Sequence, residues 1–100
     1  MPKLIILYGH PDEPPKFEEY YARRHIPYAI EHMRGVIGAE NLQVLSTADG
    51  GSPPYYRISQ LAYDTMSDLR ASIGSGDGKA VLADLRNFAT GGATILITEP

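Results

Sequence analysis

The residues best suited to chemistry lie in one stretch, residues 17–33, which combines histidine with aromatic side chains. Within it Phe17, Tyr21 and His25 are spaced four apart, so a helix would place all three on one face. An imidazole exchanges protons near neutral pH, and aromatic neighbours would keep water away from it. The spacing therefore predicts His25 as a general acid or base, with a tyrosine fixing a carbonyl or hydroxyl group of the substrate.

Structural roles account for the same side chains, and both interpretations stay open. A histidine near the end of a helix often forms a capping or other structural hydrogen bond. Tyr20 and Tyr21 are adjacent, so only one of them can face the interior fully, and a tyrosine on a buried face is commonly a core residue whose hydroxyl reaches water. We take His25 and Tyr21 as the catalytic candidates, and Phe17, Tyr20 and Tyr28 as candidates for contact with a substrate.

Composition limits the classes of protein to which this chain can belong. One hundred residues, 43% of them hydrophobic, fit a single domain, residues 1–100, with one core. The net charge of −3 is spread along the chain without a basic run, which argues against nucleic acid as a partner. The absence of cysteine excludes disulfides, thiol nucleophiles and thiolate metal ligands. The longest apolar run, residues 4–8, is too short to cross a bilayer, and we expect a cytoplasmic protein.

No metal, phosphate or nucleotide site is predicted. His25 and His32 are seven residues apart, about 10 Å along a helix axis, which is too far for one metal ion without ligands between them. The glycine-rich segment 74–79 follows a predicted helix instead of a strand, and Ala80 stands where a phosphate loop needs serine or threonine. We expect a flexible connection there. Redox activity would need a loosely held cofactor, a partner protein or direct reaction of the substrate with oxygen, and haem bound through His25 stays an alternative.

Hydrophobic periodicity predicts four strands and two helical regions. Residues 3–8 are apolar at nearly every position, which is typical of a central strand covered on both faces. The Pro-Pro pair that follows Glu13 suits the start of a helix, and Pro27 should kink or restart that helix between His25 and Tyr28. The other predicted elements are strands at residues 41–46, 55–63 and 93–98, and helical segments that begin after Thr65 or Ser67 and resume over residues 79–88.

The resulting order, β-α-β-β-α-β, predicts an α+β domain with a ferredoxin-like, four-stranded antiparallel sheet and helices on one face. Right-handed crossovers place the first and third strands at the centre and the second and fourth at the edges. Helices would cover only one face, yet the strands are apolar on both, as at Ile5, Leu7 and Ile95. The pattern therefore predicts a homodimer in which the open sheet faces of two copies meet.

Three segments resemble one known family. They are residues 7–11, the Tyr-Tyr-x-x-x-His-x-Pro pattern of residues 20–27, and the Asp-Leu-x-Asn-Phe-Ala-x-Gly-Gly pattern of residues 84–92. In this order and separation they resemble the EthD family, named for ethyl tert-butyl ether degradation, nearly end to end. The resemblance implies a dimeric α+β barrel, in which two ferredoxin-like subunits join their sheets. Relatives in that superfamily include cofactor-free monooxygenases, isomerases, polyketide cyclases and haem-degrading proteins, so the fold alone does not give the reaction.

The C-terminal pattern adds three candidates for contact with a substrate, Asp84, Asn87 and Phe88. Asp84 and Asn87 are one turn apart, and they could orient His25 or a ligand if the two helical regions lie side by side. Helix capping and anchoring of the following loop explain the same two residues equally well.

Three functions are compatible with these patterns. The leading hypothesis is a homodimeric enzyme that acts on a small, largely apolar, oxygenated or aromatic molecule held between the sheet and the first helix, with acid–base or oxidoreductase-type chemistry at His25 and no bound cofactor. The resemblance leaves the reaction open, because oxidoreductase, dehydratase and decarboxylase activities are ascribed to different members. The second hypothesis is a non-catalytic protein that binds a hydrophobic metabolite for a partner oxygenase. In the third, the helix face that carries His25 is part of a close-packed core, and His25 only forms a hydrogen bond with the backbone.

Overall fold

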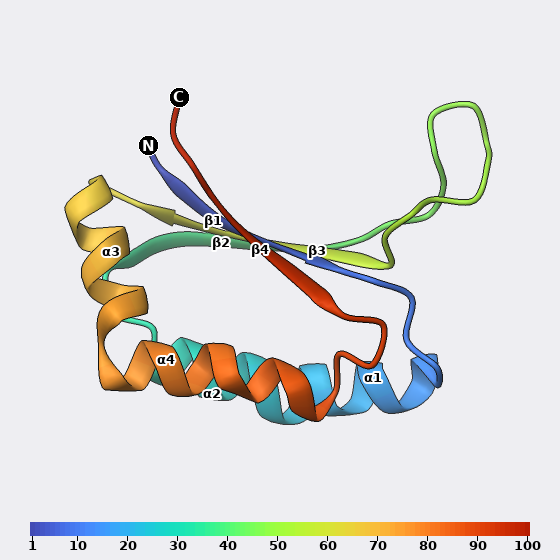
Figure 1. The fold of residues 1–100 in the computed structure, drawn as a ribbon, viewed down its shortest axis with the longest axis horizontal. Coiled ribbons are helices and arrows are strands. Elements are labelled where there is room, and N and C mark those ends of the chain that lie inside the picture. Colours follow the sequence, from blue (N-terminus) through green and yellow to red (C-terminus); the bar gives the residue numbers. More distant parts are fainter.

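The computed structural model describes residues 1–100 and arranges them as a sheet with a layer of helices against one face (Figure 1). The strands are β1 (Lys3–Tyr8), β2 (Val36–Gln43), β3 (Arg57–Tyr63) and β4 (Ala93–Thr98). The helices are α1 (Pro14–Tyr20), α2 (Ile26–His32), α3 (Met66–Gly74) and α4 (Gly76–Ala83), with a π-helical turn at Tyr21–His25 and a 3-10 turn at Asp84–Asn87. None of the helices is both long enough and apolar enough to cross a membrane.

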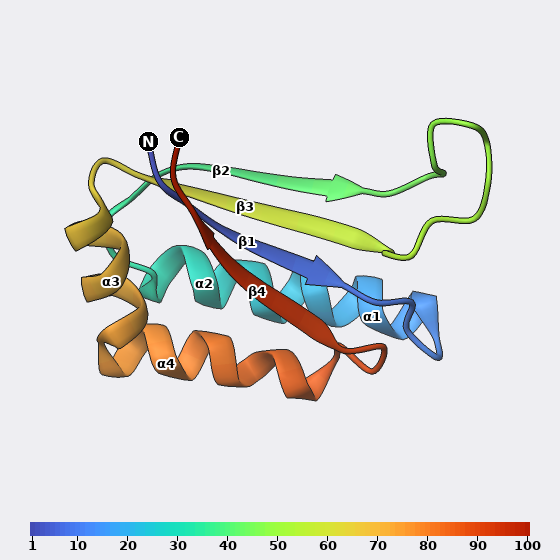
Figure 2. The same ribbon diagram turned by 45° about the horizontal axis from the view of Figure 1, so that its top comes forward.

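The sheet is antiparallel with strand order β2-β3-β1-β4, so the first and third strands are central (Figure 2). This confirms the ferredoxin-like arrangement and the bounds of β1 and β4. The predicted starts of the other two strands are wrong: β2 begins at Val36 and β3 at Arg57. Pairing with β3 extends β2 through Gly38, although glycine disfavours strands. The connection between β2 and β3, residues 44–56, projects beyond the sheet (Figure 1).

One nearly continuous helical segment runs from α1 through α2, and Pro27 does not end it. Proline lacks an N–H, and in an α-helix its ring would press on the carbonyl of Arg23. The chain instead forms a π-helical turn, in which the N–H of Ile26 donates to the carbonyl of Tyr21, five residues earlier. The interruption predicted at the proline therefore takes the form of one wide turn, and this turn carries His25.

Serine and threonine caps define the corner between α3 and α4. Thr65 accepts a backbone N–H bond of 3.1 Å at the start of α3, as its sequence position predicts. Ser75 caps α4 by accepting from the N–H of Gly78 at 2.9 Å. A Cβ on Gly78 would collide with the carbonyl oxygen of Ser72, so this position needs glycine. The expected connection over residues 74–79 is much shorter in the structure, because α3 ends at Gly74 and α4 begins at Gly76.

Side chains between the two layers form two hydrophobic clusters. The aromatic cluster consists of Ile6, Tyr8, Phe17, Tyr21, Leu85 and Phe88. The aliphatic cluster consists of Leu4, Met33, Tyr63, Leu69 and Val81. The helical turn that carries the candidate chemistry lies on the aromatic cluster, while α3 closes the aliphatic one.

The other face of the sheet has no helix over it (Figure 1). Side chains of β1 alternate between the faces, so Ile5 and Leu7 lie half-buried on the open face. Leu96 pairs with Ile5, which places it on the same open face, where it is 42% exposed. Ile95 pairs with Ile6 and therefore faces the helices, contrary to the expectation that it lies on the open face. It is nevertheless 40% exposed, because β4 is at the edge of the sheet.

Candidate functional site

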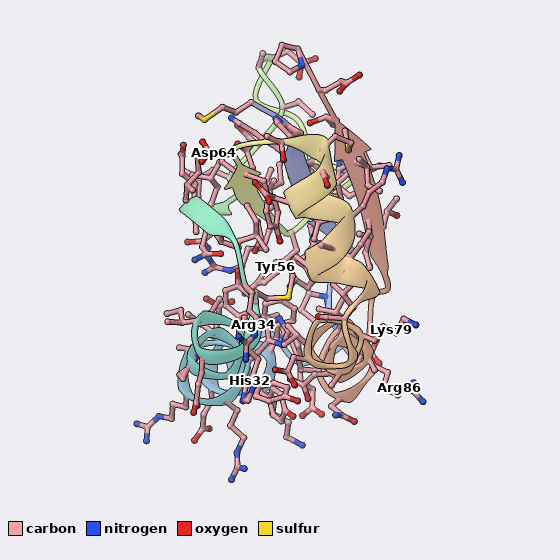
Figure 3. The ribbon with its side chains drawn as sticks, turned by 90° about the vertical axis from the view of Figure 1, so that its left-hand side faces the viewer. His32, Arg34, Tyr56, Asp64, Lys79 and Arg86 are labelled. Atoms are coloured by element: carbon pink, nitrogen blue, oxygen red, sulfur yellow. The ribbon has the colours of Figure 1, made fainter.

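A hydrogen-bonded group centred on Asp84 joins the two helical regions. Nδ1 of His25 lies 2.9 Å from Oδ2 of Asp84, and both side chains are largely buried. Oδ1 of Asp84 accepts from the hydroxyl of Tyr20 at 2.7 Å and from the side-chain amide of Asn87 at 2.9 Å. Helices α2 and α4 pack side by side, as the end-on view of Figure 3 shows. The two helical regions therefore lie side by side, as contact between Asp84 and His25 requires.

Hydrogen bonds keep Asp84 ionised. Burial alone would raise its pKa, but hydrogen bonds from His25, Asn87 and Tyr20 outweigh burial and hold the pKa of Asp84 below its ordinary value. The bond to this carboxylate in turn raises the pKa of the Tyr20 hydroxyl. A carboxylate can only accept, so the proton of a neutral imidazole lies on Nδ1 of His25 and Nε2 keeps its lone pair. This is the tautomer of a general base whose accepting nitrogen points away from Asp84.

Aromatic rings surround the imidazole of His25, which is 2% exposed. Its ring centroid lies 4.7 Å from that of Phe88 and 6.1 Å from that of Tyr21, with the Tyr21 ring nearly parallel. Within the chain His25 forms one side-chain hydrogen bond, the bond to Asp84. The expectation that His25 bonds backbone is therefore wrong, and its second ring nitrogen is free for another partner.

A small void lies beside His25, between the sheet and the helices. Its volume is about 30 Å³, which gives room for about one water molecule. Three strands bring polar side chains to its wall, namely Tyr8 from β1, Asn41 from β2 and Ser59 from β3. Apolar side chains of α2, α4 and the sheet complete the lining. The void is thus a polar spot within an otherwise apolar interior.

The hydroxyl of Tyr8 is the one fully buried side-chain polar group in the chain without a hydrogen-bond partner. Ser59 lies nearby, but its hydroxyl is hydrogen-bonded to Tyr21 at 2.6 Å and to Asn41 at 3.0 Å. Burial raises the pKa of Tyr8 far above its ordinary value, and the neighbouring Tyr21 contributes a smaller increase. Ser59 works against this rise in pKa, but it lies outside normal hydrogen-bond distance and angle. Tyr8 therefore stays protonated, and its hydroxyl keeps a donor without a well-formed hydrogen bond in the chain.

An apolar groove adjoins this void. It has a volume of about 240 Å³, lies between α2 and strands β2 and β3, and is lined by eight residues of which seven are apolar. Five residues line both the groove and the void: Ile26, Ala29, Met33, Asn41 and Leu61. The void therefore lies next to the inner end of the groove, and His25 and Tyr8 line the void.

Three of the residues proposed from the sequence lie in packed surroundings. Phe17 is 1% exposed within the aromatic cluster. Tyr21 is buried as well, and its hydroxyl is hydrogen-bonded to side chains of β2 and β3. Tyr28 packs on His32, with ring centroids 4.6 Å apart. None of the three lines the groove or the void.

The other three lie behind His25, on the side away from the groove. Tyr20 and Asn87 donate to Asp84, and Phe88 packs against the imidazole. All three also line a separate surface hollow of about 290 Å³. The structure thus brings them to His25 itself, where they fix its position, and not to the groove that adjoins the void.

Sequence reasoning missed the three polar side chains that the strands contribute. In the sequence Tyr8 is the last residue of a predicted strand and part of the segment 7–11 that resembles the family, and Asn41 and Ser59 are ordinary strand positions. Asn41 and Ser59 are directly paired between β2 and β3. Two polar residues on the helix-covered face are a usable signal, but it becomes visible only when the register of the two strands is known.

His32, the other histidine of the helical region, is separate from this site. It lies at the end of α2 near Arg34 (Figure 3). Its Nδ1 is 3.7 Å from a carboxylate oxygen of Asp77, which also lies 3.9 Å from Arg34. No three histidine, aspartate or glutamate side chains of the chain converge on a position that could hold a metal ion.

Comparison with known proteins gives the family. The EthD domain model matches residues 11–92. This chain belongs to the EthD family. An uncharacterised 11.0 kDa protein in the thcB–thcC intergenic region of Rhodococcus erythropolis is 30% identical to it over 101 residues, which cover 99% of this chain and 94% of that protein. The crystal structure of an EthD family protein from Bacillus halodurans is 27% identical, with a TM-score of 0.90 over 100% of this chain and 98% of that chain.

More distant solved structures share the fold of this EthD protein. A dimeric protein of unknown function with a ferredoxin-like fold, from Bacteroides fragilis, is 11% identical, with a TM-score of 0.66 over 99% of this chain and 95% of that chain. SnoaB, a cofactor-independent oxygenase from Streptomyces nogalater, is 13% identical, with a TM-score of 0.63 over 99% and 90%. At these identities the comparison establishes common architecture.

Proposed function

We propose that this EthD protein acts as a homodimer that binds a small, largely apolar, oxygenated or aromatic molecule in the groove between α2 and the sheet, and that His25 moves a proton to or from that molecule. The observation that carries the proposal is the 2.9 Å bond between Nδ1 of His25 and Asp84, since it leaves Nε2 as an acceptor on a side chain that lines the void next to the groove. A histidine oriented by a buried carboxylate is a recurrent form of general base.

The dimensions of the groove support a small ligand. Its volume of about 240 Å³ falls just below the range of about 300 to 1,000 Å³ that is usual for ligand pockets. A single ring with one or two substituents would fill it. Only a small polar end of such a molecule would enter the void at His25, so the apolar body would lie against α2 and the polar end would meet the base.

The open face of the sheet supports the homodimer. Ile5, Leu7 and Leu96 lie together there without helices to cover them, and a second copy placed against this face would remove them from water. The dimeric Bacteroides fragilis protein of the same fold supports a dimer. SnoaB, a cofactor-independent oxygenase of the same fold, supports chemistry without a bound cofactor.

Proton transfer at His25 can be tested before the natural substrate is known. Acetophenone has a single ring with one substituent, in keeping with the volume of the groove. It carries exchangeable C–H bonds beside its carbonyl, so a general base in D2O replaces these hydrogens with deuterium. We expect the wild-type protein to accelerate this exchange, and His25→Ala to lose the acceleration by about 100-fold or more. The matched control is His32→Ala, which removes a histidine outside the site and should keep the wild-type rate.

The possible outcomes separate the hypotheses. Equal exchange rates in wild type and His25→Ala, with both proteins folded, would contradict the catalytic proposal. Saturable binding of acetophenone without any exchange would favour the non-catalytic alternative, a protein that holds a metabolite for a partner oxygenase. Light scattering tests the assembly: we expect twice the monomer mass, and Leu7→Lys, which puts a charge on the open face, should shift the protein toward monomer.

A further inference from the structure

Tyr8 and His25 both line the void at the inner end of the groove, and each has a polar atom without a partner in the chain, the hydroxyl of Tyr8 and Nε2 of His25. We infer that the molecule bound there ends in a neutral hydroxyl group, that of a phenol or an enol, which accepts a hydrogen bond from Tyr8 and donates one to Nε2 of His25. This inference rests on the proposed function and assigns a ligand-binding role to Tyr8, a residue outside the EthD model's 11–92 match.

The surroundings of Tyr8 set it apart from the other buried tyrosines. Tyr63 is 0% exposed and donates to Ser72 at 3.1 Å, and Tyr21 donates to Asn41 at 2.9 Å. Tyr8 is 1% exposed and has no partner. A buried donor without an acceptor is unfavourable, and native structures contain few of them. A ligand oxygen at the void would supply the missing acceptor.

The chemistry of the two groups selects a hydroxyl over other polar ends. A hydroxyl can accept and donate at once, which matches a phenolic O–H of Tyr8 on one side and a bare Nε2 of His25 on the other. A carboxylate offers only acceptors and would place negative charge against the lone pair of Nε2. An ammonium group offers only donors and would leave Tyr8 unpaired. The void of about 30 Å³ also has the size of one hydroxyl group and is too small for a carboxylate.

This placement defines a balanced proton transfer. The O–H bond of the phenol or enol breaks, its proton forms an N–H bond at Nε2 of His25, and the electron pair stays on the ligand oxygen. The resulting imidazolium is hydrogen-bonded to ionised Asp84, and the anionic oxygen accepts from Tyr8. Phenols have a pKa of about 10, and both contacts stabilise the ionised pair. Tyr8 therefore acts on the ligand oxygen, and His25 on its proton.

Three para-substituted benzenes test the inference by calorimetry. They are 4-ethylphenol, ethylbenzene and 4-ethylbenzoate, which share a ring and an ethyl group and differ in their polar end. We expect the wild-type protein to bind 4-ethylphenol at least about tenfold more tightly than ethylbenzene, and 4-ethylbenzoate most weakly. Tyr8→Phe should weaken 4-ethylphenol about tenfold and leave ethylbenzene unchanged, because only the hydrogen bond is removed. Urea unfolding of Tyr8→Phe checks that the variant is folded.

The other outcomes would contradict the role of Tyr8, the proposed site, or both. Unchanged affinity of Tyr8→Phe for 4-ethylphenol, tighter binding of 4-ethylbenzoate by wild type, or no binding of any probe would overturn the inference. If His25→Ala weakens 4-ethylphenol while Tyr8→Phe does not, the role of Tyr8 fails and the proposed function stands. If wild type binds 4-ethylphenol but neither variant changes its affinity, the ligand lies elsewhere, and the proposed site fails with the inference.

Discussion

Three tyrosines are buried in the two hydrophobic clusters of this protein, and the hydroxyl of Tyr8 differs from those of Tyr21 and Tyr63. In the aliphatic cluster Tyr63 donates to Ser72, so the polar atom is satisfied inside the chain. In the aromatic cluster Tyr8 is buried just as deeply but has no partner, and the neighbouring His25 has one ring nitrogen free. Because all three tyrosines are buried, burial alone does not distinguish a core residue from a residue of the site. The difference is whether the chain itself completes the hydrogen bonding.

The largest effect on stability is expected from a cavity in the aliphatic cluster. Leu69 is 0% exposed there, and Leu69→Ala should lower the free energy of unfolding by about 3 kcal/mol, because a close-packed site collapses little around the cavity. Urea denaturation followed by circular dichroism measures the loss. A loss under about 1 kcal/mol would show that this cluster is loosely packed, and the contrast with the aromatic cluster would disappear.

The next largest effect concerns the carboxylate behind His25. Asp84→Asn should lower the free energy of unfolding by about 2 kcal/mol at pH 7, since a neutral amide makes weaker hydrogen bonds to the surrounding donors. Folding lowers the pKa of Asp84, so its carboxylate adds stability above the unfolded pKa of about 3.9, and this contribution is lost as the pH falls through the folded pKa. The difference between wild type and variant should therefore shrink in acid. A difference independent of pH contradicts this account.

A third variant fills the groove instead of the core. Ala29 lines both the groove and the void, and Ala29→Leu should weaken binding of 4-ethylphenol at least tenfold, about 1.4 kcal/mol. Leucine is a good helix former, so the unfolding free energy should change by less than about 1 kcal/mol. Calorimetry and urea denaturation of the same sample measure both. Full binding with a filled groove would place the ligand elsewhere.

The smallest effects come from the two tyrosines compared directly. Tyr63→Phe removes a hydrogen bond and should cost about 1 kcal/mol of stability. Tyr8→Phe removes a hydroxyl that has no partner in the chain, and it should leave stability unchanged or raise it slightly. Parallel urea titrations of the two variants give the comparison. If Tyr8→Phe costs as much as Tyr63→Phe, the Tyr8 hydroxyl is structural, held for instance by a buried water molecule.

The sequence predicted the fold well because its signals there are local. Residues 3–8 are apolar and bounded by turn residues, and the alternation within them separates Ile5 and Leu7 from the buried side chains. The starts of β2 and β3 could not be read locally, since hydrogen bonds between the two strands set them. A pairing partner thus overrides the weak strand propensity of Gly38.

The site was predictable only in part. The spacing of residues 17–25 drew attention to His25, and its contact with Asp84 followed once the helices were known to lie side by side. The sequence placed the substrate between the sheet and the first helical region, where the groove lies, but the residues that line the groove could not be predicted, because they depend on how several elements pack. The role of Tyr8 was hidden for a similar reason. Whether its hydroxyl finds a partner depends on the neighbouring side chains across the sheet. The catalytic and binding roles of all these residues stay predictions.

The π-helical turn at Tyr21–His25 absorbs one residue of the chain without turning the helix that follows it. In an α-helix each residue advances the direction of its side chain by about 100°, and in a π-helical turn the advance is smaller because each hydrogen bond spans one residue more. Five residues of such a turn therefore advance the direction about as far as four residues of an α-helix. Deleting one residue from this turn, such as exposed Ala22, would restore regular bonding and leave Ile26 and Ala29 facing the strands. The wide turn therefore works as a spacer that keeps the groove-lining side of α2 aligned with the buried side of α1.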